Sequence, residues 1–141
     1  MDVMGASKIK VEVLVDAPLA KAWEYWISPD HITRWYAASD DWHTPRATND
    51  VKVGGGFSFR MEARNKSAGF DFQGSYTLVS PREHLHCLLG DGRHLDIRFL
   101  AEGNRVMIVE EFDTETTNSV EHQRKGWQAI LDSFKRYVEA G

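Results

Sequence analysis

The sequence predicts one α+β domain in which a long C-terminal helix packs against an antiparallel sheet. Apolar side chains recur at helical spacing between Ser119 and Ala140, and no other stretch carries a helical pattern of that length. Most of the preceding chain alternates apolar with polar residues, as half-buried strands do, and turn residues separate the alternating runs. We therefore expect residues 1–141 to form a single domain, with residues 1–7 disordered.

The N-terminal part of the domain is predicted to hold one strand and two short helices. Residues 8–15 alternate apolar with mostly charged side chains, which indicates a half-buried strand. Residues 16–17 suit the N-cap of a first helix, because Pro18 fits its first turn. Ser28 suits the N-cap of a second helix, because Pro29 fits its first helical position.

The middle of the chain reads as about six successive antiparallel strands. Gly54-Gly55-Gly56 marks a turn or a bent strand entry, and it is a poor phosphate loop because no helix pattern and no Lys-Ser/Thr pair follows it. Short turns such as Gly103-Asn104 join the strands. The predicted strands cover residues 42–51, 57–62, 70–78, 85–89, 95–99 and 106–112.

The long C-terminal helix needs a broad apolar surface to lie on. Asn118 or Ser119 suits its N-cap, and Glu121 suits the positive end of its dipole. At about 1.5 Å per residue, such a helix spans about 30 Å, the width of a small domain. Its predicted buried stripe consists of Val120, Trp127, Ile130, Leu131, Phe134, Tyr137 and Val138.

Composition excludes several classes of protein. Lys and Arg total 17 against 21 Asp and Glu, and no basic run stands out, which argues against nucleic acid as the partner. Cys87 is the single cysteine, so no internal disulfide forms and a reducing compartment is expected. No apolar run reaches the length of a membrane span, and no secretory leader is recognisable. We therefore expect a cytoplasmic protein.

One carboxylate falls on the face of the sheet that should be buried. A tight turn at Gly103-Asn104 pairs Ala101 with Val106, Phe99 with Ile108 and Ile97 with Glu110. Two interpretations stay open for Glu110: it is solvated or paired with an arginine at an open sheet edge, or it faces an internal cavity. Inside a cavity, desolvation would raise its pKa, and it would need a partner or a water molecule.

The histidines do not form an evident catalytic or metal site. A turn at Asp91 pairs His86 with Asp96 and puts His84, His94 and Arg98 on the same outer face. These ligands could in principle hold Zn²⁺, but an exposed polar face is preferred because they would have to converge on an open surface beside an arginine. No histidine is paired with an evident nucleophile, no Gly-x-Ser-x-Gly elbow exists, and Cys87 lies on the core face. We predict no metal and no cofactor.

The aromatic residues are more numerous than a small core needs, with five Trp, seven Phe and four Tyr. They either fill the space between the helix and the sheet, or they line an apolar pocket there. Gly126, beside Trp127, would let the helix approach the sheet closely or leave room in that gap.

Five segments, in their order and spacing, resemble the START-like (SRPBCC) superfamily, and within it the branch related to the C-terminal domain of the Hsp90 ATPase activator. The resemblance covers Lys8 to Ala140. It implies a helix-grip fold: a curved antiparallel sheet of about six to seven strands around the C-terminal helix, with two short helices after the first strand. The segments are VDAPLAKAWE (15–24), Trp35-Tyr36, VKVGGGF (51–57), VEEFDTE (109–115) and GWQAILDSF (126–134).

Members of this superfamily include binders of apolar molecules, cyclases and co-chaperones, so three functions remain open. The first hypothesis is binding of a small apolar or amphipathic ligand between the helix and the sheet, with Glu110 as the orienting polar group. The second is a cyclase or hydrolase in which Glu110 acts as acid or base and Tyr76 donates to an oxyanion. The third is an Hsp90-related co-chaperone or another protein-interaction module. The apolar walls of the ligand site are predicted to be Trp35, Phe59, Phe72, Tyr76, Ile97, Phe112, Trp127 and Leu131.

Overall fold

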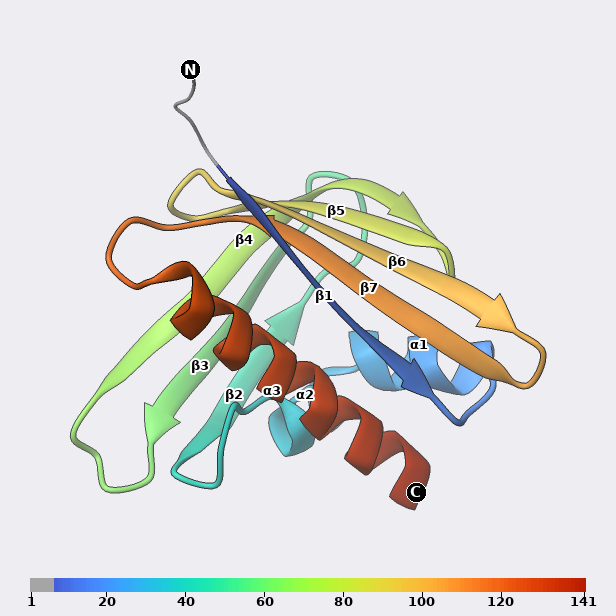
Figure 1. Cartoon of the computed structure of the whole chain (residues 1–141), viewed down its shortest axis with the longest axis horizontal. Helices are drawn as coiled ribbons and strands as arrows, with labels where there is room; N and C mark the ends of the chain where they lie inside the picture. The colour runs from blue at the N-terminus through green and yellow to red at the C-terminus, as the bar shows by residue number, and fades with distance from the viewer. Residues whose placement is uncertain (1–6) are drawn as a thin grey trace.

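The computed structural model describes residues 7–141, within which seven strands form one antiparallel sheet and three helices pack on it (Figure 1). Residues 1–6, most of the segment expected to be disordered, lie outside the described residues. The elements are β1 (Lys8–Val15), α1 (Leu19–Ile27), α2 (Pro29–Trp35), β2 (Trp42–Asn49), β3 (Gly56–Ala63), β4 (Gly69–Ser80), β5 (His84–Leu89), β6 (His94–Glu102), β7 (Arg105–Asp113) and α3 (Val120–Ala140).

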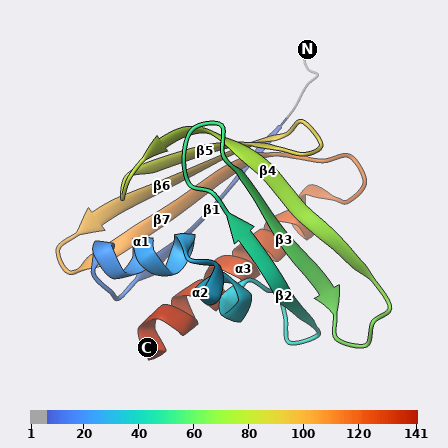
Figure 2. The ribbon, with the colours of Figure 1, turned by 180° about the vertical axis from the view of Figure 1, so that it is seen from behind.

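The sheet has the strand order β1-β7-β6-β5-β4-β3-β2 and curves into an arch over α3. Seen from behind, α1 and α2 lie under the same arch beside α3 (Figure 2). This arrangement confirms the predicted fold class, an α+β helix-grip with a long C-terminal helix and two short helices after the first strand. Within residues 7–141, no helix combines the length and the apolar character that crossing a membrane requires.

The core lies between the concave face of the sheet and the C-terminal half of α3. Leu131, Phe134 and Val138 are fully buried there, and Phe134 packs edge-on against the ring of Trp35 with centroids 4.7 Å apart. Trp35 also has two polar ties, since its Nε1 donates to the carbonyl of Tyr25 and its own carbonyl accepts from the Ser133 hydroxyl at 2.6 Å. The end of α2 is therefore held in place from both α1 and α3.

The strand register agrees with the turn chemistry. Ile97 pairs with Glu110 in β6 and β7, and His86 pairs with Asp96 in β5 and β6, so both predicted registers are confirmed. β4 departs from simple alternation, because a bulge between Tyr76 and Leu78 turns Leu78 to the outer face, where it is 41% exposed.

The predicted N-cap is confirmed for α3 but not for α1. Ser119 is the N-cap of α3 and accepts from the backbone N–H of His122 at 3.1 Å, as expected. The predicted N-cap of α1 at residues 16–17 is wrong, because Pro18 occupies that position without a side-chain cap. The Asp16 backbone N–H instead donates to the Glu139 carboxylate of α3 at 2.7 Å.

Candidate functional site

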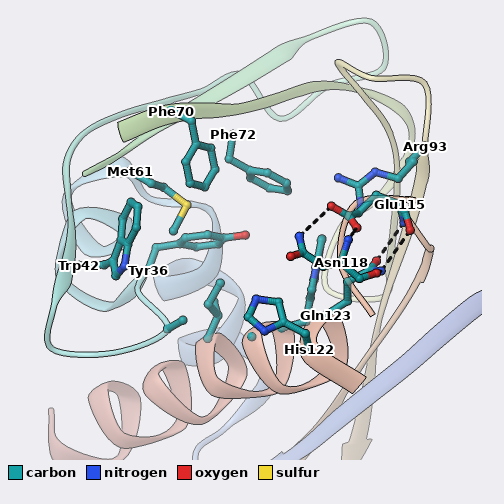
Figure 3. A pocket seen from close by; sticks show the side chains of 14 residues that line it. Tyr36, Trp42, Met61, Phe70, Phe72, Arg93, Glu115, Asn118, His122 and Gln123 are labelled. Atoms are coloured by element: carbon teal, nitrogen blue, oxygen red, sulfur yellow. Dashed lines mark hydrogen bonds between the residues drawn. The ribbon is translucent and has the colours of Figure 1, made fainter. Parts of the chain in front are cut away.

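An open pocket of about 370 Å³ lies beneath the N-terminal half of α3, between that helix and strands β2 to β4 (Figure 3). Apolar and aromatic side chains make up most of its wall. Its volume falls in the range of about 300–1,000 Å³ that is typical of small-molecule sites. The lining residues are Tyr36, Ala38, Trp42, Met61, Phe70, Phe72, Arg93, Glu115, Asn118, His122, Gln123, Gly126, Trp127 and Ile130.

The helix side of this pocket depends on Trp127 and Gly126. The Trp127 indole stacks on Phe112 with ring centroids 3.9 Å apart, and Phe72 meets it edge-on at 5.8 Å. Gly126 precedes Trp127 in the helix and also lines the pocket. A Cβ built at Gly126 meets no heavy atom within 4 Å. Of the two roles considered for Gly126, leaving room in the gap therefore applies.

The polar end of the pocket is held by Gln123, which is 6% exposed. Its side-chain amide donates to the carbonyls of Glu115 and Asn118 at 3.1 and 2.8 Å, and its side-chain oxygen accepts from the Glu115 N–H at 2.9 Å. Gln123 thus ties the loop before α3 to the first turn of the helix. The loop carboxylate of Glu115, which accepts from the Asn118 N–H at 2.6 Å, is fixed at the pocket mouth near Arg93.

A second, inner chamber lies deeper in the core and holds only about 30 Å³, enough for one or two water molecules. Tyr36 and Phe72 line both spaces and therefore form the partition between them. Aromatic side chains fill most of the region that surrounds this chamber. Its wall consists of Trp26, Trp35, Tyr36, Asn49, Phe57, Phe59, Phe72, Tyr76, Cys87, Leu95, Ile97 and Glu110.

Glu110 faces this inner chamber and is 4% exposed, so the cavity-facing interpretation of its register applies. Within residues 7–141, no side chain or backbone group forms a hydrogen bond or an ion pair with its carboxyl group. Burial raises the pKa of Glu110 to about 8, because the charged form would lose its hydration without gaining a partner. The group is therefore mostly a neutral carboxylic acid at pH 7.

Burial also raises the pKa of two other titratable groups that line the chamber, Cys87 and Tyr76. Burial raises the pKa of the Cys87 thiol to about 12 and moves the pKa of Tyr76 above its usual value. The Tyr76 hydroxyl already donates to the side-chain oxygen of Asn49 at 2.6 Å, and the Asn49 amide donates in turn to the carbonyl of Ile27. Tyr76 is thus engaged in a structural network, which weakens its assignment as an oxyanion donor.

The residues predicted to form one ligand site are divided between two spaces. Phe72 and Trp127 line the open pocket. Phe112 and Leu131 are fully buried and line neither space, although Phe112 supports Trp127 from behind. Those that line the inner chamber are Trp35, Phe59, Phe72, Tyr76, Ile97 and Glu110.

Tyr36 is one of several pocket residues absent from the predicted ligand site, and others are Trp42, Met61, Phe70 and Gln123. Tyr36 follows α2 directly, is 7% exposed, and lies across the open pocket with its hydroxyl directed away from Trp42 (Figure 3). Thr44 fixes its backbone by donating to the Tyr36 carbonyl at 2.5 Å. The only available signal was its place in the Trp35-Tyr36 pair, since a tyrosine at a helix end has no defined facing direction in the sequence.

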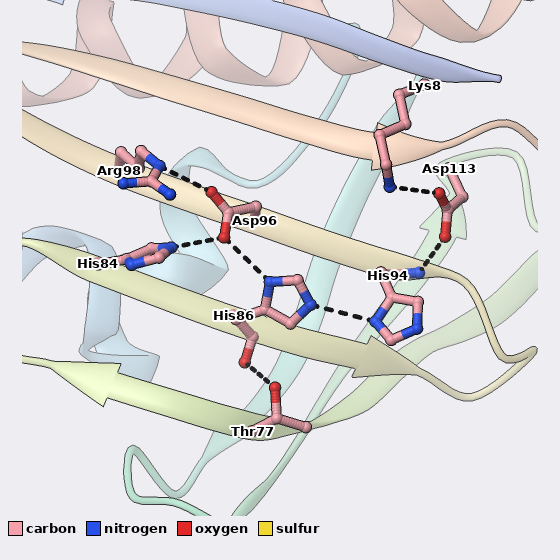
Figure 4. Close-up of polar contacts among 8 residues, drawn as sticks. All are labelled: Lys8, Thr77, His84, His86, His94, Asp96, Arg98 and Asp113. Atoms are coloured by element: carbon pink, nitrogen blue, oxygen red, sulfur yellow. Dashed lines mark hydrogen bonds and ion pairs between the residues drawn. The ribbon is translucent and has the colours of Figure 1, made fainter.

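The histidines of β5 and β6 form a hydrogen-bonded chain on the outer face of the sheet (Figure 4). Asp96 Oδ1 contacts His84 Nε2 at 2.5 Å and His86 Nδ1 at 3.0 Å, and His86 Nε2 lies 3.1 Å from His94 Nδ1. Burial alone would raise the pKa of Asp96, but hydrogen bonds from His86 and His84, with Arg98 nearby, hold it below its usual value. Among residues 7–141, no group of three or more His, Cys, Asp and Glu side chains could hold a metal ion.

A curved sheet that grips a long C-terminal helix over an apolar pocket defines a protein of the START-like superfamily. The chain belongs, more narrowly, to the family described as Activator of Hsp90 ATPase homolog 1-like protein, whose family model matches residues 16–139. Among curated proteins, none matches this chain.

Solved structures support this assignment at two levels of similarity. The AHSA1-like protein from Aeromonas hydrophila is 44% identical, with 95% of this chain and 93% of that chain covered and a TM-score of 0.89. A protein from Cytophaga hutchinsonii is 48% identical, with 94% and 92% covered and a TM-score of 0.82. A protein from Nitrosomonas europaea is only 14% identical, with 94% of each chain covered and a TM-score of 0.79, and so shows the fold alone.

Proposed function

We propose that this protein binds a small apolar or amphipathic molecule in the pocket between α3 and the sheet. The observation that carries the proposal is an open space of about 370 Å³ with mostly apolar walls in a chain of this size. Burying an aromatic ligand there removes apolar surface from water, at about 25 cal/mol per Å². The polar mouth at Arg93 and His122 suits a ligand with one polar end.

The proposal keeps the predicted site residues but gives them different roles. Phe72 and Trp127 would contact the body of the ligand, while Phe112 and Leu131 would support the wall. Glu110 keeps its predicted role as the orienting polar group at the inner end. A cytoplasmic location belongs to the same proposal, because the single cysteine, Cys87, is buried and free, as is typical of reducing compartments.

Pocket binding can be tested with the fluorescent amphipathic probe 1-anilinonaphthalene-8-sulfonate and two substitutions at one position. Gly126→Phe would place a ring in the pocket, because nothing lies within 4 Å of the new Cβ. Gly126→Ala is the matched control, since a methyl group leaves most of the space open. We expect saturable probe fluorescence and a raised midpoint of thermal unfolding for the wild type and Gly126→Ala, and neither effect for Gly126→Phe.

The same measurement separates pocket binding from adhesion to the surface. All three proteins should show the same circular dichroism spectrum, which confirms that each is folded. Equal probe affinity in all three proteins would mean that the probe binds elsewhere, and it would remove the support for a ligand site under α3.

A chaperone partner is the second candidate, favoured by the family description, Activator of Hsp90 ATPase homolog 1-like protein. The test is the ATPase rate of purified Hsp90 with increasing amounts of this chain. Stimulation that is equal for the wild type and Gly126→Phe would indicate a surface contact that does not use the pocket. An unchanged ATPase rate at saturating concentration would reject this candidate.

A further inference from the structure

Two buried residues with polar side chains, Tyr36 and Glu110, line the same small chamber. The Glu110 carboxyl group and the Tyr36 hydroxyl are in residues that are 4% and 7% exposed, and both line the chamber of about 30 Å³. Within residues 7–141, neither side chain forms a hydrogen bond, although Tyr76 in the same wall donates to Asn49. Because a buried polar group without a partner costs about 1–3 kcal/mol, a water molecule or a ligand atom is expected between them.

Both groups are hydrogen-bond donors in their buried state. The lining of the chamber contains no Lys, Arg or His, so nothing compensates a negative charge on Glu110, and the carboxyl group stays protonated. Burial, followed by the proximity of Glu110, moves the pKa of Tyr36 well above its usual range. A neutral carboxylic acid in an apolar site donates its proton to an acceptor, as a phenol does.

The size of each space limits which part of a ligand can reach these donors. The inner chamber admits only a group of the size of one or two water molecules, whereas a ring system fits only the outer pocket. Tyr36 and Phe72 line both spaces, so the outer pocket and the inner chamber adjoin at these two side chains. An oxygen that projects from a flat ring has the required size.

We propose that the Tyr36 hydroxyl and the Glu110 carboxylic acid form a two-donor site for the carbonyl oxygen of an aromatic or polycyclic ligand. This inference rests on the proposed function, since the rings of the ligand occupy the pocket under α3. The carbonyl oxygen accepts one hydrogen bond from each group through its two lone pairs, and it replaces the water that fills the chamber in the free protein.

The experiment compares 2-acetylnaphthalene with 2-ethylnaphthalene, two probes of nearly the same shape that differ in one carbonyl oxygen. Their dissociation constants are measured by displacement of 1-anilinonaphthalene-8-sulfonate. We expect the ketone to bind about tenfold more tightly than the hydrocarbon. A ¹³C label in the acetyl carbonyl provides a second readout, because hydrogen-bond donation shifts its NMR signal downfield from its position in water-free solvent.

Two variants assign the donors. Tyr36→Phe removes one hydroxyl and keeps the ring, and we expect the ratio of the two affinities to fall about fivefold. Tyr25→Phe is the matched control, because Tyr25 is on α1, lines neither space and should leave the ratio unchanged. Glu110→Gln keeps a donor at the same position and should preserve most of the preference.

A pH series tests the proton on Glu110. The titratable groups around it are Tyr36, Tyr76 and Cys87, which burial keeps neutral to high pH, and the chamber wall from β3 and β6 is apolar. Raising the pH from 6.5 to 9.5 should therefore ionise Glu110 alone in the chamber and reduce the ketone preference severalfold. In Glu110→Gln the preference should not change with pH.

The outcomes separate this inference from the proposed function. Equal affinity for the two naphthalenes, with no shift of the carbonyl signal, would leave the pocket as a ligand site but overturn the two-donor site, whose chamber would then hold water only. A ketone preference that survives in Tyr36→Phe, or that is the same at both pH values, would also overturn it. Failure of both probes to bind would overturn the inference together with the proposed function.

Discussion

Glu110 is a carboxyl group that folding removes from water without giving it a partner. Its pKa rises from an ordinary 4.5 to about 8 through burial alone. Between these two values the folded state keeps the proton while the unfolded state releases it. Folding therefore takes up a proton in this range, and the free energy of unfolding falls as the pH rises.

The first prediction concerns Glu110→Gln. Glutamine cannot ionise, so the stability of the variant relative to the wild type should increase between about pH 4.5 and pH 8, by up to about 1.4 kcal/mol per pH unit. Urea unfolding of both proteins at several pH values measures this difference, and contributions from other carboxylates cancel in it. Parallel stability curves across this range would show that Glu110 is hydrated or paired in the folded protein.

Gln123 is the second residue whose role depends on burial. Its amide nitrogen faces three backbone carbonyls, of Glu115, Asn118 and Ser119, so its function requires donors and not acceptors. A residue of the same shape but opposite hydrogen-bonding character at this position should be poorly tolerated.

We predict that Gln123→Ala destabilises the protein by about 1–3 kcal/mol, because it leaves buried backbone groups without partners. Gln123→Glu has the same shape but sets a carboxylate against three carbonyls, and it should destabilise the protein further at neutral pH than at pH 4. Thermal unfolding at the two pH values provides the comparison. If both variants match the wild type, the loop before α3 does not depend on this tie.

At the scale of the element, the two halves of α3 have different surroundings. Its C-terminal half carries Leu131, Phe134 and Val138, which are fully buried against the sheet and α2. Its N-terminal half stands over the open pocket, with Gly126 and Trp127 on the inner side. The helix is therefore anchored at one end and forms a wall of the pocket at the other.

Gly126 lies in the interior of this helix, where glycine costs about 0.5–1 kcal/mol relative to alanine. Because a Cβ there meets nothing within 4 Å, we predict that Gly126→Ala raises the free energy of unfolding by about that amount. Chemical denaturation measures the change. A destabilised Gly126→Ala protein would mean that the helix and the sheet approach each other more closely than the pocket implies.

At the scale of the whole molecule, the arch of the sheet is filled unevenly. The rings around Trp35 and Phe134 pack tightly, whereas the space under the first half of α3 stays open. Regions with fewer buried contacts open more readily and exchange their amide hydrogens faster.

We therefore predict slower hydrogen exchange for amides from Leu131 to Val138 than for amides from Arg124 to Gln128, despite their common helix. Saturation with 1-anilinonaphthalene-8-sulfonate should slow exchange mainly in the second group. Mass spectrometry of peptic peptides gives both results. Uniform exchange along α3, unaffected by the probe, would indicate that its two halves are equally supported.

Much of this architecture is predictable from local patterns. Residue alternation, turn chemistry at Gly103-Asn104 and the Ser119 cap specify the sheet register and the start of α3, because each depends on neighbours close in sequence. The same register singles out Glu110 as an inward-facing carboxyl group. The bulge at Tyr76 and the loss of the α1 cap were not predictable, because each depends on contacts with distant strands or with α3.

The shape of the candidate site was decided only by tertiary packing. Periodicity specifies which face of an element a side chain occupies, but not how much space remains after several elements meet. Packing places most of the predicted walls around a chamber of about 30 Å³, opens a pocket of about 370 Å³ under the first half of α3, and sets Tyr36 between them. It also engages the Tyr76 hydroxyl with Asn49 while the Tyr36 hydroxyl stays without a protein partner within residues 7–141. These outcomes depend on side-chain volumes brought together from six strands and three helices, which no local pattern encodes.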